Sequence, residues 1–149
     1  MIWKLSTDER LRKWKQFRNS LGDHDLPTAL AMVDEFWRSV PFSPYYLDPT
    51  RPEDWPDPWT MITENYYCDV AKALGMLYTV ALSSHKTNSS MRIYHSRDQH
   101  KLYNLAWFED GKYVLNMTDD GVVNKSYTDQ ESLILKFEYS DKQLKLDSY

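Results

Sequence analysis

The stretch NYYCDVAKALGMLYTV, residues 65–80, contains the only cysteine of the chain, Cys68, within an apolar pattern of helical spacing. The pattern begins upstream of this stretch. Its apolar residues recur every three or four positions: Trp59, Ile62, Tyr66, Val70, Leu74, Leu77 and Ala81. Such spacing places side chains on one face of a helix that packs against a core. We therefore expect a central helix region over residues 58–82, around which the rest of the fold is arranged.

The start and the interior of this region carry further signals. Asp57 followed by Pro58 is a favourable helix start, because Asp is a good N-cap and Pro is tolerated in the first turn. Gly75 lies in the helix interior, where glycine costs about 1 kcal/mol relative to alanine, and this indicates close packing against a neighbouring element. The pattern leaves open whether one helix runs throughout or two helices join near residues 63–67.

Two amphipathic helices are predicted before the central region. Ser6 and Glu9 form a capping-box pattern at the start of the first helix. Its apolar face is Leu11, Trp14, Phe17 and Leu21. The second helix is expected from Pro27, a favoured first-turn residue. Its apolar face is Leu30, Val33, Phe36, Trp37 and Val40. The short link between the two predicts an antiparallel helical hairpin over residues 1–40.

A proline-rich segment follows the hairpin. Residues 41–59 contain six of the seven prolines of the chain, among aromatic and acidic residues. Each proline removes a backbone donor and fixes its own φ, so the segment is expected to be extended or turning. We expect a strap over residues 41–57 that crosses the surface. The residues expected to pack inward are Tyr45, Tyr46, Leu47 and Trp55.

The last third of the chain has the pattern of a β-sheet. Short runs rich in β-branched and aromatic residues occupy residues 91–96, 101–108, 112–117 and 133–140. Asp110-Gly111 and Asp120-Gly121 are turn signals, and the first predicts a hairpin. A further strand is expected in QLKLDS, residues 143–148, giving four or five antiparallel strands over residues 91–149. Helices followed by strands predict an α+β fold, and 149 residues fit a single domain.

Composition restricts the possible functions. The net charge of -4 gives no general attraction to nucleic acid, so a nucleic-acid partner is not predicted. One cysteine excludes an internal disulfide, and the first residues lack the pattern of a signal peptide, which predicts a reducing interior. No apolar run approaches the roughly 20 residues that span a bilayer. The isolated glycines and scattered histidines predict neither a nucleotide cofactor nor a metal site.

The position of Cys68 raises the question of chemistry, because a helix N-terminus or a neighbouring imidazolium promotes a reactive thiolate. The order of elements over residues 57–118 resembles the transglutaminase-like branch of the papain-type fold. The matching pieces are Cys68, Leu74-Gly75, Leu105-Ala106-Trp107 and Tyr113-Val114-Leu115-Asn116. The resemblance implies a helix that starts at a nucleophilic cysteine and packs on an antiparallel sheet, whose strands carry a histidine base and an orienting acid.

The chain departs from that family pattern at the two positions that assist the cysteine. Leu105 stands at the expected place of the base, where it cannot accept a proton, and Asn116 stands at the place of the acid. We therefore expect a catalytically inactive core in which Cys68 fills space, as buried cysteines do. The alternative is a cysteine hydrolase or acyl transferase that uses Cys68 with His95 or His100 and with Asn116.

A second resemblance concerns the proline-rich segment. LDPTRPEDWPDPW followed by ALGMLYT, within residues 47–79, is similar to small uncharacterised proteins of tailed bacteriophages, often encoded near virion genes. The resemblance implies a structural component of the virion, in the tail, baseplate or neck, that is assembled in the host cytoplasm. Its role would be to contact other virion proteins in a homo-oligomer or hetero-oligomer. A small phage inhibitor of a host protein is a further alternative.

The aromatic content, 15% of residues, supports a role in contacts, because Trp and Tyr combine apolar area with a hydrogen-bonding tip. The candidate interface residues of the strap region are Tyr45, Tyr46, Trp55 and Trp59. The first helix also carries a basic outer face: Arg10, Arg12, Lys13, Lys15 and Arg18. This face is either a solvated surface or a site for an acidic partner, with Arg12 and Lys15 as its candidate contacts.

Overall fold

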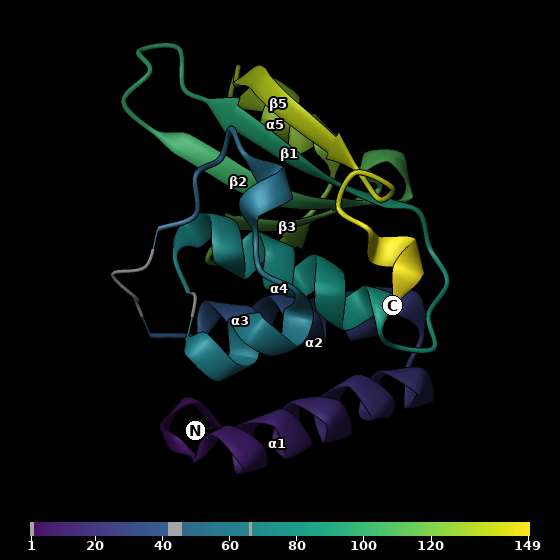
Figure 1. The fold of residues 1–149 in the computed structure, drawn as a ribbon. Coiled ribbons are helices and arrows are strands. Elements are labelled where there is room, and N and C mark those ends of the chain that lie inside the picture. The colour runs from purple at the N-terminus through teal and green to yellow at the C-terminus, as the bar shows by residue number, and fades with distance from the viewer. Residues whose placement is uncertain (1, 42–45, 66) are drawn as a thin grey trace.

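The computed structural model describes residues 2–41, 46–65 and 67–149, and it has the expected α+β fold (Figure 1). Helices occupy the first part of the chain and a five-stranded antiparallel sheet follows.

The N-terminal helices form as their caps predict. Helix α1 spans Thr7–Ser20, and the Ser6 hydroxyl accepts a hydrogen bond of 3.4 Å from the backbone N–H of Glu9. Helix α2 spans Leu26–Arg38, and the Asp25 carboxylate caps it by accepting from the N–H of Thr28 at 3.0 Å. A 3-10 turn, η2 (Leu21–Asp23), joins the two helices into the predicted hairpin.

The central region consists of two helices, which answers the question that the apolar pattern leaves open. Helix α3 spans Pro58–Glu64 and ends at Asn65, whose left-handed backbone (φ 59°) ends the helix as asparagine often does. Helix α4 spans Asp69–Ala81, and its N-cap is Cys68. The break therefore places Cys68 at a helix start.

The sheet has the order β4-β3-β2-β1-β5. Its strands are β1 (Ser89–His95), β2 (Leu102–Phe108), β3 (Tyr113–Thr118), β4 (Gly121–Val123) and β5 (Ile134–Ser140). Both turn signals join antiparallel neighbours, which confirms the hairpin predicted at Asp110-Gly111. Between β4 and β5 lies a short helix, α5 (Lys125–Gln130).

The strand predicted over residues 143–148 is wrong. This segment is a series of turns that ends in a 3-10 turn, η5 (Leu146–Ser148), which contacts α4. Leu144 and Leu146 are buried in the main core, so the alternating apolar pattern fills the space beside a helix instead of extending the sheet.

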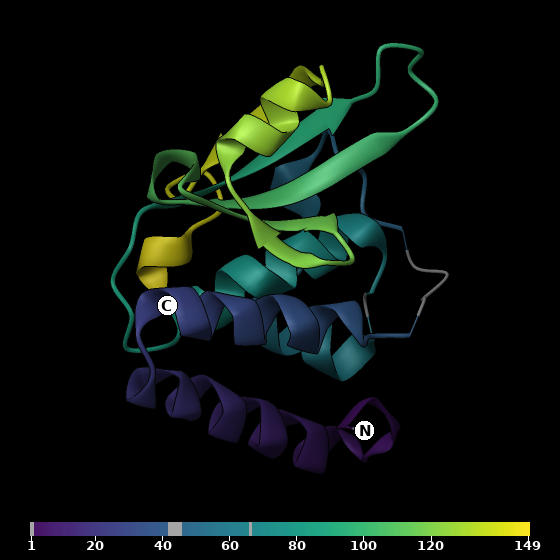
Figure 2. The same cartoon turned by 180° about the vertical axis from the view of Figure 1, so that it is seen from behind.

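The elements form layers (Figures 1 and 2). One face of the sheet packs on α4 and α2, and α1 forms an outer layer beyond them. Figure 2 shows α5 on the opposite face of the sheet. The two faces bury separate apolar clusters, and the larger lies between the sheet and the helices.

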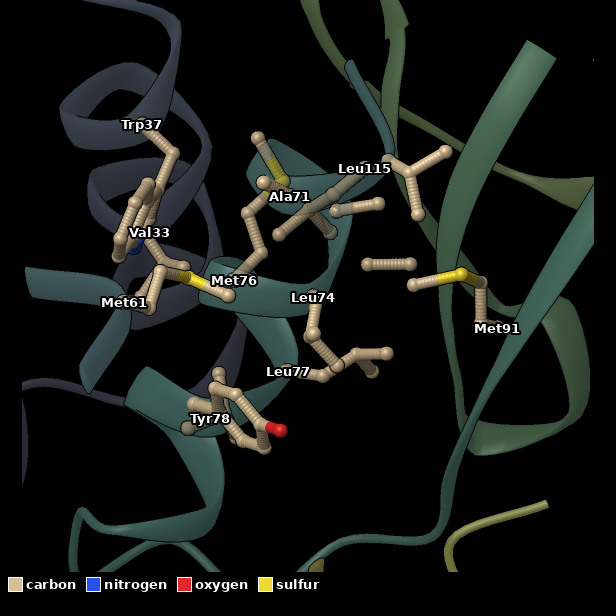
Figure 3. Close-up of a cluster of buried hydrophobic side chains, with 14 of the residues drawn as sticks. Val33, Trp37, Met61, Ala71, Leu74, Met76, Leu77, Tyr78, Met91 and Leu115 are labelled. Atoms are coloured by element: carbon tan, nitrogen blue, oxygen red, sulfur yellow. The ribbon is translucent and has the colours of Figure 1, made fainter. Parts of the chain in front are cut away.

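Helix α4 is buried between α2 and the sheet (Figure 3). Leu74 and Leu77 are directed towards Met91 of the sheet, whereas the opposite side of α4 meets Trp37 of α2. A Cβ added at Gly75 would lie 2.6 Å from ring atoms of Trp37, so the glycine permits the close helix contact that the sequence predicts.

The strap is partly as predicted. Leu47 is buried, and the ring of Trp55 packs edge-on against Tyr139 with centroids 5.5 Å apart. The prediction that Tyr46 packs inward is wrong, because 72% of this residue is exposed. The same prediction for Tyr45 lies outside the described residues.

Candidate functional site

Cys68 is held as part of the interior at the start of α4. Only 6% of the residue is exposed, and its Sγ accepts a hydrogen bond of 3.4 Å from the N–H of Leu47 in the strap. The Cys68 side chain does not cap its own helix. The strap thus contacts α4 at Cys68 and covers the thiol. A nucleophilic cysteine would instead have to be accessible to its substrate.

The two candidate histidines make other contacts. His95 ends β1, and its Nδ1 lies 2.8 Å from the carbonyl oxygen of Ser96. His100 is exposed in the turn that leads to β2. Among the hydrogen bonds of the described ranges, none joins Cys68 to either histidine.

The residue that faces the start of α4 from β2 is Asn104. Its Nδ2 donates to Oδ2 of Asp69, the first residue of α4, at 2.7 Å. Leu105 points to the other face of the sheet, into the smaller apolar cluster. The alternation of strand side chains therefore places Asn104, one residue before the expected position, beside the helix start.

Asn116 of β3 completes a polar cluster at this helix start. Its Nδ2 donates to Oδ1 of Asp69 at 3.3 Å and to the backbone carbonyl of Asn104 at 2.9 Å. Its backbone has a positive φ of 67°, a conformation that asparagine tolerates better than most residues. We call Asp34, Asp69, Asn104 and Asn116 the polar cluster.

Asp34 connects the polar cluster to α2. It is fully buried, accepts a hydrogen bond of 2.9 Å from the N–H of Asn116, and pairs with Nε of Arg38 at 2.9 Å. Burial raises the pKa of the Asp34 carboxyl, and the hydrogen bond from Asn116 and the charge of Arg38 oppose that rise. The cluster thus ties α2, α4, β2 and β3 together.

The two amides of the polar cluster orient other groups but do not accept a proton near neutral pH. Its two carboxylates, Asp34 and Asp69, accept hydrogen bonds from the same chain. A small cleft of about 210 Å³ opens beside Asp69 and Asn116, and its charged lining includes Arg38, Lys72 and Lys101. Within the described ranges, no three His, Cys, Asp or Glu side chains gather as metal ligands would.

A second concave region lies where the strap meets the end of the chain. A cleft of about 470 Å³ is lined by side chains from η3 (Pro52–Asp54), α4 and the C-terminal turns. Its lining includes Trp55, Tyr78, Leu144 and Tyr149. We call it the aromatic cleft.

Rings in edge-on contact lie at the aromatic cleft: Tyr78 and Tyr149 line it, and Trp59 packs on Tyr149 outside that lining. The ring centroid of Tyr149 lies 5.6 Å from that of Trp59 and 5.7 Å from that of Tyr78. Tyr78 donates its hydroxyl to the carbonyl of Pro56 at 2.7 Å. Trp59 and Tyr149 remain 44% and 38% exposed, so large rings are open to the surroundings at this edge of the cleft.

Acidic groups stand beside these rings. Glu53 and Asp57 line the aromatic cleft, opposed within it by Lys145. Burial raises the pKa of the Tyr149 hydroxyl, and the charge of Asp57 raises it further. Burial also raises the pKa of Tyr78, as do the neighbouring Tyr149 and the charge of Asp57. The exposed ring faces and the nearby carboxylates of Glu53 and Asp57 are groups to which a cation can bind.

The basic face of α1 separates into buried and exposed parts. Arg10 is buried and donates to the backbone carbonyls of Ile62 and Thr63, each at 3.0 Å. Arg18 lies over the ring of Trp14, and burial lowers its pKa. Arg12 and Lys15, the two candidate contacts, are exposed and remain available to a partner, as is Lys13 of the same predicted face.

Several residues of these sites are absent from the sequence predictions. Asp34 could have been identified from the sequence, because it is a charged residue on the apolar face of α2, between Val33 and Trp37. Asn104, Tyr78 and Tyr149 carried no local signal, because their roles depend on contacts between distant segments.

Comparison of the chain with protein-family models, curated proteins and solved structures finds no match. None of the helices in the described ranges is long and apolar enough to cross a membrane.

Proposed function

We propose that this protein is an assembly component that acts through protein–protein contacts made at the aromatic cleft. The observation that carries the proposal is a pair of exposed rings at the edge of the cleft: Tyr149, which lines it, and Trp59, which packs on Tyr149. Tryptophan and tyrosine are the residues that most often dominate binding energy at interfaces, especially around a pocket.

The start of α4 supports a contact role over a catalytic one. Cys68 is buried and bonded to the strap, and the carboxylate of the next residue, Asp69, is bonded to the amide of Asn104. The helix start at Cys68 favours a thiolate, but a nucleophile also needs a base and access to substrate, and among the described residues no hydrogen bond joins Cys68 to a histidine. The alternative of a cysteine hydrolase using His95 or His100 is therefore the less favoured function.

The proposed setting is the virion of a tailed bacteriophage, in the tail, baseplate or neck. This part of the proposal rests on the resemblance of residues 47–79 to phage proteins, and the strap that carries the resemblance also supplies Glu53, Trp55 and Asp57 of the aromatic cleft. The protein would contribute surface and shape to a larger assembly after folding in the host cytoplasm.

Quantitative mass spectrometry of purified virions tests this function. A fixed number of copies per particle, retained through gradient purification, is the expected result. Absence from particles, together with capture of a single host protein from infected cells, would instead support the inhibitor alternative. Absence from particles with a thiol-dependent hydrolase activity would support the enzyme.

A further inference from the structure

We propose that the aromatic cleft binds the basic outer face of α1 from a second copy of this chain. The inference rests on the proposed contact function and names the partner of the same site. It is drawn from two surfaces of opposite charge that the fold keeps apart.

The strap beside the aromatic cleft carries an excess of negative charge, and within the lining itself Glu53 and Asp57 are opposed by the single base Lys145. Residues 46–59 contain four acids, Asp48, Glu53, Asp54 and Asp57, and one base, Arg51. Arg51 is 2.7 Å from Asp54 and 3.6 Å from Glu53, so a single guanidinium is shared between two carboxylates. The exposed rings of Trp59 and Tyr149 lie beside these acids.

The α1 side carries unpaired positive charge. Arg12 and Lys15 are three residues apart, so they project from the same side of the helix, and Lys13 adds a third exposed cation. None of the ion pairs among residues 2–41, 46–65 and 67–149 involves these three side chains. In Figure 1 the helix forms the outermost layer of the molecule, where its outer face is open.

Within one molecule, the basic outer face of α1 cannot reach the aromatic cleft. Arg10 fixes α1 against the end of α3 by two hydrogen bonds, and Trp14 donates its Nε1 to Thr79 of α4 at 3.1 Å. Arg12 and Lys15 project from the opposite side of the helix from Arg10, away from α3. A cleft that receives them therefore belongs to another molecule, and a second copy of this chain carries such a cleft.

The chemistry of the two surfaces matches. A guanidinium or ammonium over the rings of Trp59 and Tyr149 gains a cation–π interaction, and Glu53 supplies an ion pair at the rim. Each copy offers one basic helix and one aromatic cleft, so the contact closes a two-fold pair or continues into a ring. Self-association of either kind suits a component of a symmetric particle.

The experiment is sedimentation velocity of the full chain over a concentration series. Wild type is expected to self-associate at an ionic strength of about 0.05 M, with an apparent Kd that rises at least about tenfold at about 0.5 M, because salt screens exposed charges. The charge-reversal variants R12E/K15E and E53K/D54K are each expected to weaken self-association by at least about tenfold. Circular dichroism and thermal unfolding verify that both variants fold.

A mixing experiment separates this contact from general charge effects. Equimolar R12E/K15E and E53K/D54K should associate with each other as tightly as wild type does with itself, since each supplies the partner surface that the other needs. The matched control D129K/E131K reverses two exposed acids, Asp129 of α5 and Glu131 directly after it, at the opposite face of the sheet, and should associate as wild type does.

The inference is overturned by a wild type that stays monomeric over the whole concentration series, by self-association that survives both reversals, or by a mixture that does not associate. A protein that is monomeric in solution but present at fixed copy number in virions would contradict only the proposal that the partner of the cleft is a second copy. A self-associating protein that is absent from virions would overturn only the virion function.

Discussion

The polar cluster and the aromatic cleft both gather side chains of the kinds that functional sites use, but these side chains have different partners. In the polar cluster, Asp69 and Asn116 bond to other parts of the same chain. In the aromatic cleft, Trp59 and Tyr149 keep large parts of their rings exposed. Most polar groups of this cluster bond within the chain and fix the backbone, with the buried Oδ1 of Asn104 left without a hydrogen-bond partner among the described residues, whereas exposed rings are free to bind. The polar cluster therefore serves the fold, and the cleft serves contact.

The largest expected effect on stability is that of Asp34→Ala. The substitution leaves the buried N–H of Asn116 without its acceptor and Arg38 without its ion pair, so the free energy of unfolding should fall by about 3 kcal/mol. Urea unfolding followed by tryptophan fluorescence measures it. A loss below about 1 kcal/mol would show that the polar cluster does not hold the fold together.

Asn116→Ala should cost about 2 kcal/mol, because it removes two side-chain hydrogen bonds and places alanine at a positive φ. Asn116→Gly loses the same hydrogen bonds but relieves the backbone, so it should cost about 1 kcal/mol less than the alanine variant. The difference between the two unfolding curves measures the backbone contribution. Equal losses would mean that the backbone conformation of Asn116 carries no strain.

Cys68→Ala should lower the free energy of unfolding by about 1 kcal/mol, because a mostly buried sulfur is lost together with a weak acceptor for Leu47. The thiol of the native protein should react with iodoacetamide much more slowly than in urea. A native thiol that reacts as fast as the unfolded one would show that Cys68 is accessible and could be functional. The contrast between a structural polar cluster and a binding aromatic cleft would then be weaker.

Trp59→Ala should have the smallest effect on stability, below about 1 kcal/mol, because nearly half of the residue is already exposed. Thermal unfolding beside wild type measures it. A large destabilisation would mean that the ring supports the fold as the polar cluster does, and the comparison between the two regions would fail.

The helical hairpin was predictable because its signals are local. Ser6 and Asp25 cap helices through residues three positions away, and apolar spacing defines the buried faces. The same spacing could not locate the break between α3 and α4, because apolar residues continue in phase on both sides of it. Only the left-handed backbone of Asn65 marks the end of α3.

The sites were less predictable because they depend on contacts between distant segments. The hydrogen bond between Asp34 and Asn116 joins residues 82 positions apart. Tyr149 reaches Trp59 only because the last segment turns along α4, where an alternating pattern suggested a strand. Trp55, the predicted residue that lines the aromatic cleft, comes from the strap, whose composition is unusual on its own, and Trp59 follows at the start of α3.

The most direct test of the central claim is the number of copies of the Trp59→Ala variant per purified virion, relative to wild type, with D129K/E131K as control. The account predicts a drop of at least about tenfold for the variant, the loss expected of an interface hot spot, with unchanged folding and no drop for the control. Equal incorporation of Trp59→Ala and wild type would contradict the assignment of the aromatic cleft as the contact surface.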